Sequence, residues 1–292
     1  MNSKDISAIL ALAALWGASF IFIRIASPDL GPLTTIQWRV TLASLALIII
    51  IKLTHRTIEW KRWWKQYLIL GGINAALPFT FIATAELYLN ASMSSILNAL
   101  TPLFTVLVAW GGLKETVTLK KWVGVVIGIL GVFILVGWSP LPLTKMVVCA
   151  IVLSLLSTIS YAFAGVYAKK VFTNVQPLSL AAGQQIGATL VLLPFSLIAL
   201  PFEKCHYSLA AILSVLGLSL FCTALAYLLY FYLIGSVGPT KTLTVTFLIP
   251  FFGMIWDVTL LHEKVTLGMF VGLIVILGSI ICISDLPLRL KR

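Results

Sequence analysis

Charged residues are scarce in this chain of 292 residues: they make up 10% of it, with 20 Lys and Arg against 9 Asp and Glu. Soluble domains carry about 25% charged residues. Hydrophobic residues instead reach 60%, and the mean hydropathy is +1.08. One soluble core cannot bury such an excess, so we expect an integral membrane protein. The net charge of +11 does not indicate nucleic-acid binding, because the basic residues lie at the ends of apolar runs.

Motifs for nucleotide, metal and disulfide chemistry are also missing. The sequence has no GxxxxGK[ST] loop, which argues against ATP-driven transport, and no HExxH pair or acidic metal cluster. Its three histidines fall in separate predicted loops. No CxxC pair occurs among its four cysteines, which are Cys149, Cys205, Cys222 and Cys282. We therefore expect no cofactor, no metal site, no disulfide framework and no enzyme active site.

Long apolar runs dominate the chain instead. A membrane-spanning helix needs about 20 mostly apolar residues. Ten runs qualify, at 7–27, 33–53, 67–89, 93–112, 119–137, 146–168, 178–200, 209–234, 240–260 and 266–284. These runs are continuous rather than alternating, so strands are not expected. The first run is too long for a signal peptide and has no small-residue cleavage site, which predicts a retained helix. The sequence thus predicts an all-α membrane protein with ten transmembrane helices.

The chain also repeats itself at about half its length. Residues 101–135 match residues 249–283 at an offset of 148 without a gap. An internal match of this kind predicts two copies of one unit, which we place at 1–138 and 139–292. Each copy holds five predicted helices, an odd number, so the second copy enters the membrane upside down relative to the first. Such inverted-topology repeats are typical of secondary transporters.

The distribution of Lys and Arg predicts how the chain is oriented. Fifteen of them fall in one set of loops and termini and three in the opposite set, while Arg24 and Arg39 lie within predicted helices. Because cytoplasmic loops carry the excess of basic residues, both termini are predicted to be cytoplasmic.

Several residues together resemble a known family. Trp16-Gly17 stand early in the first helix, Pro32 is followed by Arg39, and the Leu-x-Glu-x-x-Thr turn at Leu113 recurs at Leu261. With the helix that contains Pro102, these features are similar to EamA-type permeases of the drug/metabolite transporter superfamily. The resemblance implies ten helices around a central cavity and movement of small solutes, often outward, across the inner membrane. It does not specify the solute, because the family handles amino acids, nucleotide sugars and other metabolites.

Ionisable residues inside a span are costly, about 2.5–3.5 kcal/mol at the helix centre on insertion scales, and are therefore functional candidates. Four are predicted near the outer leaflet: Arg24, Arg39, Glu86 and Asp257. Gln184 is the repeat partner of Arg39. We assign Arg39, Glu86, Gln184 and Asp257 to gating or coupling, with the two acids as candidates for proton coupling. The structural alternative is a buried ion pair, or side chains that reach the interface.

Three prolines interrupt predicted helices near mid-membrane, namely Pro78, Pro102 and Pro250. Proline removes a backbone hydrogen bond and frees a carbonyl. Interrupted helices near the midplane are where transporters place their substrate. We assign these prolines a hinge role; the alternative is a kink that serves packing only.

Aromatic and polar residues near mid-membrane form the predicted substrate site. The candidates are Trp16, Phe20, Phe79, Asn98, Tyr161, Tyr227 and Thr246. Six of them form three repeat-related pairs, and an apolar cavity with a few placed polar groups is the usual form of a small-molecule site. The alternative is that these side chains face lipid or pack in the core. We expect the site to lack a strong fixed charge, which favours zwitterionic or amphipathic solutes.

Two further features have structural interpretations. The glycines of the fifth and tenth helices permit close helix approach. Glu115 and Glu263 precede those helices, where Thr118 and Thr266 are predicted N-caps and acids favour the positive helix end. We interpret both features as packing and capping, so the protein is expected to be a monomer or a weak homodimer.

The function predicted from the sequence is secondary transport by alternating access, most simply export of amino acids or similar metabolites. The partners expected are a small-molecule solute and the lipid bilayer, with no nucleic acid. Three alternatives remain: an importer or exchanger of the same fold, a lipid translocase or membrane scaffold, and an embedded enzyme.

Overall fold

The computed structural model describes residues 2–113, 116–139, 141–173, 175–200, 206–242 and 244–283, and every regular element in these ranges is helical. The first half contains α1 (Ser3–Leu30), α2 (Pro32–Leu53), α3 (Trp60–Gly71), η1 (Gly72–Ala76), α4 (Leu77–Ala85), α5 (Ala91–Asn98), α6 (Thr101–Leu113) and α7 (Leu119–Gly137). The second contains α8 (Lys145–Val171), α9 (Pro177–Ala199), α10 (Leu209–Leu216), η2 (Gly217–Leu225), α11 (Ala226–Val237), α12 (Pro239–Thr242), α13 (Val245–Leu260) and α14 (Leu267–Ile283).

These elements combine into ten apolar spans. Eight are long enough to cross a membrane, and the two shorter apolar helices α13 and α14 complete the set. The third span runs through α3, η1 and α4, the fourth through α5 and α6, and the eighth through α10, η2 and α11. The predicted fold class, an all-α membrane protein of two five-helix repeats, is confirmed.

The third span begins earlier than the predicted residue 67. Its first two turns, from Trp60, are amphipathic rather than apolar, which is why an apolar run missed them. The ring of Trp60 stacks on Tyr67, and Trp63 packs against Phe172 at the end of α8. The basic residues of the same turns are exposed. Aromatic packing therefore extends the helix beyond its hydrophobic stretch.

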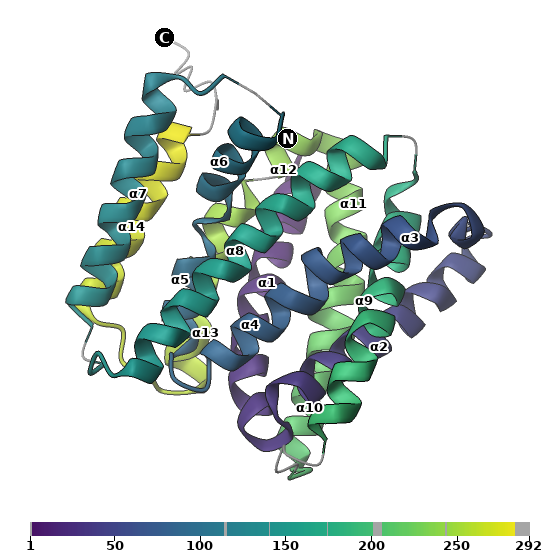
Figure 1. Ribbon diagram of the computed structural model, residues 1–292, viewed down its shortest axis with the longest axis horizontal. Coiled ribbons are helices and arrows are strands. Elements are labelled where there is room, and N and C mark those ends of the chain that lie inside the picture. Colours follow the sequence, from purple (N-terminus) through teal and green to yellow (C-terminus); the bar gives the residue numbers. More distant parts are fainter. Residues whose placement is uncertain are drawn as a thin grey trace.

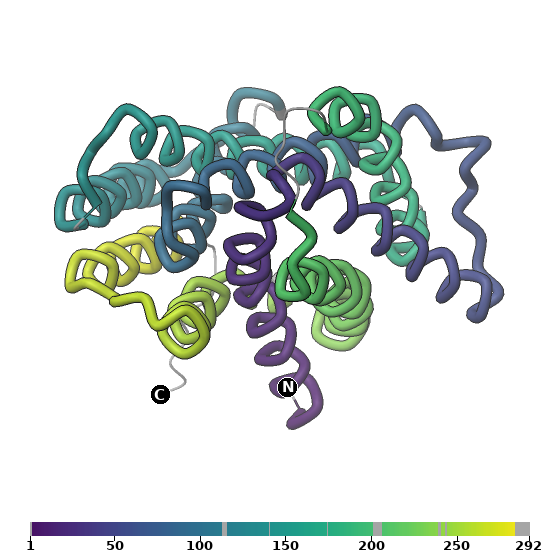
Figure 2. The backbone as a smooth tube through the Cα atoms, turned by 90° about the horizontal axis from the view of Figure 1, so that it is seen from below, coloured from purple at the N-terminus to yellow at the C-terminus, as the bar shows by residue number. Residues whose placement is uncertain are grey.

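Helix contacts between the halves come in matched sets, as expected for two copies of one unit. The first helix α1 packs on α13, and its counterpart α8 packs on α5 and α6. Likewise α2 contacts η2, while its counterpart α9 contacts α3 and η1. Two further extensive contacts join counterparts directly: α2 packs on α9, and α7 packs on α14, which lie side by side at one edge (Figure 1). Seen from below, α1 passes between α13 and the helices α10 and α11 (Figure 2).

The third helix of each half contains a π-helical segment at the equivalent position. These segments begin at Gly72 and Gly217, 145 residues apart, which equals the offset between the first helices of the two halves. A π-turn adds a residue to the helical turn and occurs often at functional sites. Both segments lie within the spans around the centre of the molecule, so the irregularity belongs to the repeated unit.

Close backbone approach holds the helices of the two halves together. A Cβ atom added to Gly187 of α9 would lie 2.2 Å from the carbonyl oxygen of Tyr67, and one added to Gly71 would lie 2.3 Å from the nitrogen of Ala188. The predicted packing glycines of α7 and α14 also approach residues of this same chain closely, which confirms their packing role: Gly124, Gly128, Gly131, Gly268 and Gly272. Without a hydrophobic drive between helices in lipid, such approach is a main source of stability.

We predict that Gly187→Ala lowers the thermal unfolding temperature of the detergent-solubilised protein. The new methyl group would overlap fixed backbone, and overpacking of this kind costs about 1–3 kcal/mol. The matched control is Gly278→Ala on α14, where an added Cβ meets nothing within 4 Å. Equal unfolding temperatures for the two variants would show that α3 and α9 do not approach as closely as described.

Candidate functional site

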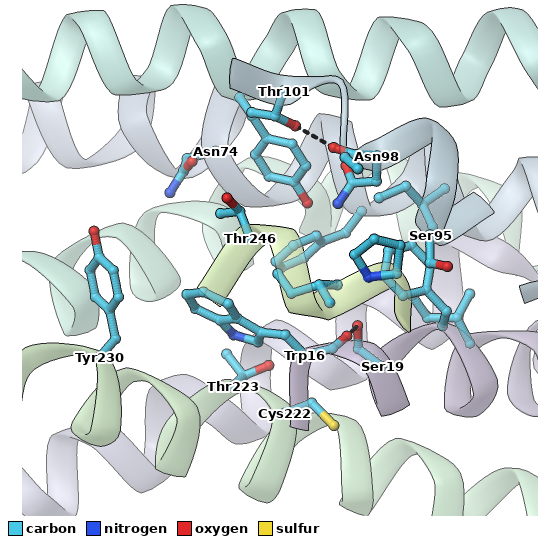
Figure 3. A pocket seen from close by; sticks show the side chains of 18 of the residues that line it. Trp16, Ser19, Asn74, Ser95, Asn98, Thr101, Cys222, Thr223, Tyr230 and Thr246 are labelled. Carbon is cyan, nitrogen blue, oxygen red and sulfur yellow. Dashed lines mark hydrogen bonds between the residues drawn. The ribbon is translucent and has the colours of Figure 1, made fainter. Parts of the chain in front are cut away.

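A cavity of about 420 Å³ lies between the two halves. Its wall is contributed by α1, α2, η1, α4, α5 and α6 together with α8, η2, α11, α12 and α13. Labelled side chains from both halves face the same space in Figure 3. The volume and the mixture of aromatic rings with a few polar groups are typical of a small-molecule site.

All seven residues predicted for the substrate site line this one cavity: Trp16, Phe20, Phe79, Asn98, Tyr161, Tyr227 and Thr246. Ring contacts order several of them. The rings of Trp16 and Tyr230 lie 5.7 Å apart, and those of Phe79 and Tyr161 lie 6.3 Å apart. The members of the repeat-related pairs thus line one cavity, although the ring contacts join other combinations of residues. Their role in substrate binding stays a prediction.

Arg39 also lines the cavity, which departs from the expectation of a site without fixed charge. Its side chain is 4% exposed. The guanidinium carbon lies 3.8 Å from the ring centroid of Phe79, and Nε donates a hydrogen bond of 3.2 Å to Thr223 Oγ1. The sequence placed Arg39 with the outer acids because depth was counted along α2 alone. Its partners come from α4 and η2, which the linear count does not show.

Gln184 does not line the cavity but forms hydrogen bonds with two residues that do. Its Oε1 accepts a hydrogen bond of 2.9 Å from Asn74 Nδ2, and its Nε2 donates one of 2.7 Å to the hydroxyl of Tyr227. Asn74 and Tyr227 line the cavity, whereas Gln184 does not. This amide therefore links η1, α9 and α11 and fixes the direction of two lining side chains. Its predicted role in gating stays a prediction.

The fourth span is broken where proline was predicted to interrupt it. Helix α5 ends at Asn98 and α6 begins at Thr101, and Pro102 has no N–H for the Asn98 carbonyl. That carbonyl instead accepts a hydrogen bond of 2.8 Å from Thr101 Oγ1 (Figure 3). The side-chain oxygen Oδ1 of Asn98 is buried, and it has no hydrogen-bond partner among the described residues. The backbone carbonyl at the break is thus paired, and the side-chain oxygen of Asn98 is the unpaired acceptor at this part of the cavity wall.

The three prolines differ in their surroundings. Pro102 and Pro250 line the cavity, whereas Pro78 does not. Pro250 lies inside the continuous helix α13, and Pro78 follows η1 within the third span. Their hinge role stays a prediction.

A polar cluster contains the other predicted ionisable residues. The guanidinium of Arg24 donates a hydrogen bond of 2.7 Å to the backbone carbonyl of Glu86. Asp257 Oδ2 accepts hydrogen bonds from the backbone nitrogen and the hydroxyl of Ser92. The Glu86 side chain is fully buried, and neither of its carboxylate oxygens has a hydrogen-bond partner among the described residues. Arg24, Glu86 and Asp257 thus lie close together, and Arg39, on the cavity wall, lies within electrostatic range of Glu86. The predicted roles of these residues in gating and coupling stay predictions.

Glu263 belongs to the same cluster, although the sequence indicated only a capping role. Its Oε1 lies 3.7 Å from Arg24 Nε. Burial and the neighbouring Asp257 raise the pKa of the Glu263 carboxyl above its ordinary value. The cap itself is confirmed, because Thr266 Oγ1 accepts a hydrogen bond from the backbone nitrogen of Met269. Glu115, the repeat counterpart, lies outside the described residues. The pairing of Glu263 with α1 has no signal in the sequence, since 239 residues separate the partners.

The cluster lies beyond one end of the cavity. Arg24 directly follows the lining residue Ile23, and Glu86 lies one turn after the lining residue Ile82. Asp257 is seven residues after the lining residue Pro250, about 10 Å along a helix. All three residues therefore lie beyond the lining residues toward the same side of the molecule. The cluster is therefore placed to close that end.

Comparison with known proteins decides the family. A model of the EamA-like transporter family matches residues 3–137 and again residues 148–285. The chain belongs to the EamA-like transporter family. The two matches agree with the internal repeat, while the division at residue 138 stays a prediction. An EamA-like chain is a multi-pass membrane transporter rather than an enzyme.

Relatives extend over nearly the whole EamA-like chain. An uncharacterized transporter of Bacillus subtilis, YvbV, is 27% identical over 275 residues, which cover 94% of this chain and 89% of the relative. The uncharacterized inner membrane transporter YedA of Escherichia coli is 26% identical over 281 residues, covering 95% and 89%. One crystal structure of a protein, 16% identical, covers both chains completely with a TM-score of 0.68 and shows the same fold.

We predict that the cavity of this transporter is accessible to water. In a variant whose four cysteines are replaced by serine, Thr105→Cys on the cavity wall should react with a small, hydrophilic thiol reagent, because a transporter cavity holding polar groups is hydrated. The control is Ser279→Cys, which is fully buried in α14. Mass spectrometry measures the modified fraction; equal modification of both sites would contradict a hydrated cavity.

Proposed function

We propose that this chain is a secondary transporter that exports small metabolites such as amino acids across the inner membrane by alternating access. The observation that carries the proposal is the cavity itself, whose wall comes from equivalent helices of both halves. A solute bound there would be exposed to one side or the other when the halves rock against each other. The similarity to YedA, which is described as an inner membrane transporter, supports the inner membrane as the location.

The basic residues near the cavity support an orientation of the chain in the membrane. Beyond the end of the cavity opposite the cluster, α8 continues to Lys169 and Lys170, and Lys241 lies in α12 beside the lining residue Thr242. Basic residues mark the cytoplasmic side. On that basis the polar cluster lies on the outer side, and both termini are cytoplasmic.

The cluster has the connections expected of an outer gate. The Arg24–Glu263 pair joins α1 of the first half to the segment before α14 of the second. The hydrogen bonds from Ser92 to Asp257 join α5 to α13 and again connect the two halves. Opening the outer side requires these links to break, since each has one partner in either half. The geometry therefore supports gating by Arg24, Asp257 and Glu263.

Protonation of the acids is the simplest way to open this gate. Protonation of the Glu263 carboxyl removes its attraction to Arg24, and the groups facing it are Arg24, Asp257 and Asn90. Glu86 and Asp257, the acids assigned to coupling from the sequence, lie within electrostatic range of each other and of Arg24. A proton gradient would thus act on a group of acids that hold the outer side closed.

Two alternatives differ in what they require of the cavity. An importer or exchanger uses the same cavity and differs only in net flux. A lipid translocase or scaffold has no need of a polar central cavity enclosed by both halves, and no described feature specifically favours either role.

We expect purified protein in liposomes to move labelled amino acids or related metabolites, and a pH gradient to accelerate the flux. Thr105→Trp fills the cavity and should abolish most of this flux. The matched control is Val126→Trp on α7, whose side chain is 56% exposed on the apolar surface and should leave flux intact. The direction of counterflow separates export from import. Flux that survives Thr105→Trp would place the pathway elsewhere.

The pH dependence of flux tests the gate. As pH falls toward the raised pKa of Glu263, its carboxyl takes up a proton, the bond to Arg24 weakens and outer opening becomes easier. Flux should therefore rise on mild acidification in the wild type and vary less in Glu263→Gln, which cannot ionise. Glu59→Gln is the control, because Glu59 is paired with Arg62 at the exposed end of α3. A full pH response in Glu263→Gln would assign the trigger to Glu86 or Asp257 instead.

A further inference from the structure

The cavity wall carries one buried cation that forms no ion pair within 4 Å in the described chain; the carboxylate that acts on it is that of Glu86, at longer range. Of the residues described along the wall, Arg39 is the charged one. The two ion pairs found in the described chain, Arg24–Glu263 and Arg62–Glu59, do not include it. A guanidinium has five N–H donors, and the one hydrogen bond observed here uses Nε. A buried cation is costly unless it is paired, so this site is prepared for a negative group.

The surroundings fix the guanidinium in one orientation. Thr223 donates its hydroxyl proton to the carbonyl of Leu218, which leaves its oxygen to accept from Arg39 Nε. Both residues belong to η2, whose π-helical turn places that hydroxyl at the cavity. The ring of Phe79 covers one face of the guanidinium. The edge formed by the two terminal nitrogens remains for a ligand.

We propose that Arg39 binds the carboxylate of the transported solute, whose apolar or aromatic body lies among the rings of Trp16, Tyr161 and Tyr230. The inference rests on the proposed transport function and specifies its substrate class. A guanidinium edge matches a carboxylate through two parallel hydrogen bonds. A single cation balances a monoanion, whereas a phosphate ester or nucleotide sugar would leave negative charge uncompensated in an apolar cavity.

We expect the amino group of such a solute to contribute less to its binding affinity than the carboxylate. No acidic side chain is among the described residues that line the cavity. The acceptors described along the wall are neutral, and they include hydroxyl oxygens and Asn98 Oδ1, which is buried and has no hydrogen-bond partner in the described chain. Monocarboxylates without an amino group should therefore bind about as well as the corresponding amino acids, and amines without a carboxylate should not.

The test is isothermal titration of the purified, detergent-solubilised protein with four related probes: 3-phenylpropionate, phenylalanine, 3-phenylpropionamide and 2-phenylethylamine. We expect the two carboxylates to bind at least about tenfold more tightly than the amide and the amine, since charge-assisted hydrogen bonds are lost in the latter. Arg39→Gln should weaken binding of the two carboxylates by a similar factor, and the affinity of Arg39→Lys should lie between those of the wild type and Arg39→Gln. Arg62→Gln, at the exposed end of α3, is the control that should match the wild type.

The outcomes separate this inference from the function on which it rests. Equal binding of acid and amide, unchanged binding in Arg39→Gln, or no carboxylate binding at all would overturn the assignment of Arg39, whatever the liposome flux shows. Carboxylate binding that depends on Arg39 without flux of any solute would support the site and overturn transport. If Arg39→Gln does not elute as a folded species in size-exclusion chromatography, the probe series on the wild type decides.

Discussion

The need to satisfy buried polar groups without help from water governs this structure. Helices meet that need for the backbone, and within the described spans the irregular segments η1, η2 and the break between α5 and α6 each contribute to the cavity wall. The broken fourth span and the two π-segments are the main departures, and each delivers a polar group to the wall: Asn98, Asn74 and Thr223. The Thr101 hydroxyl replaces the hydrogen bond lost at Pro102. Irregular backbone and solute cavity are thus two aspects of one constraint.

The same constraint explains how the halves are held together. Helix pairs such as α3–α9 approach through glycine, where backbone meets backbone over a small area. Polar links join the halves at both ends of the molecule: Ser236 hydrogen-bonds to Asp5 and Arg56 to Gln176, whereas Ser208 hydrogen-bonds to Asp29 near the cluster of Arg24, Asp257 and Glu263. Of these links, the cluster contains the one ion pair between the halves in the described chain. Under the proposed mechanism, the links at one end must break whenever the cavity opens to that side.

Much of this was predictable because repeats and apolar runs are local properties of the sequence. Repeat-related pairs such as Phe79 and Tyr227 identified the cavity wall, since equivalent positions in inverted halves meet at the centre. What the sequence did not indicate depends on contacts between distant segments. Arg39 was grouped with the outer acids, and Glu263 was taken for a cap, because their partners lie on other helices. Each π-segment begins at a glycine, but a glycine within an apolar run does not by itself indicate a π-turn, so the sequence did not reveal these segments.

Two buried ionisable groups form no ion pair within 4 Å in the described chain, Arg39 at the wall and Glu86 in the cluster. They have opposite charge and would bind different species: Arg39 an anion and Glu86 a proton. A carboxylate at Arg39 forms a neutral pair inside the cavity, which lowers the cost of enclosing both charges. Protonation of the outer acids likewise removes charge from the region that must open. Under the proposed mechanism, the solute neutralises Arg39 at the cavity wall, and the proton neutralises an acid of the outer cluster. In the apolar surroundings of both sites, a charge that is not neutralised in this way is costly to bury.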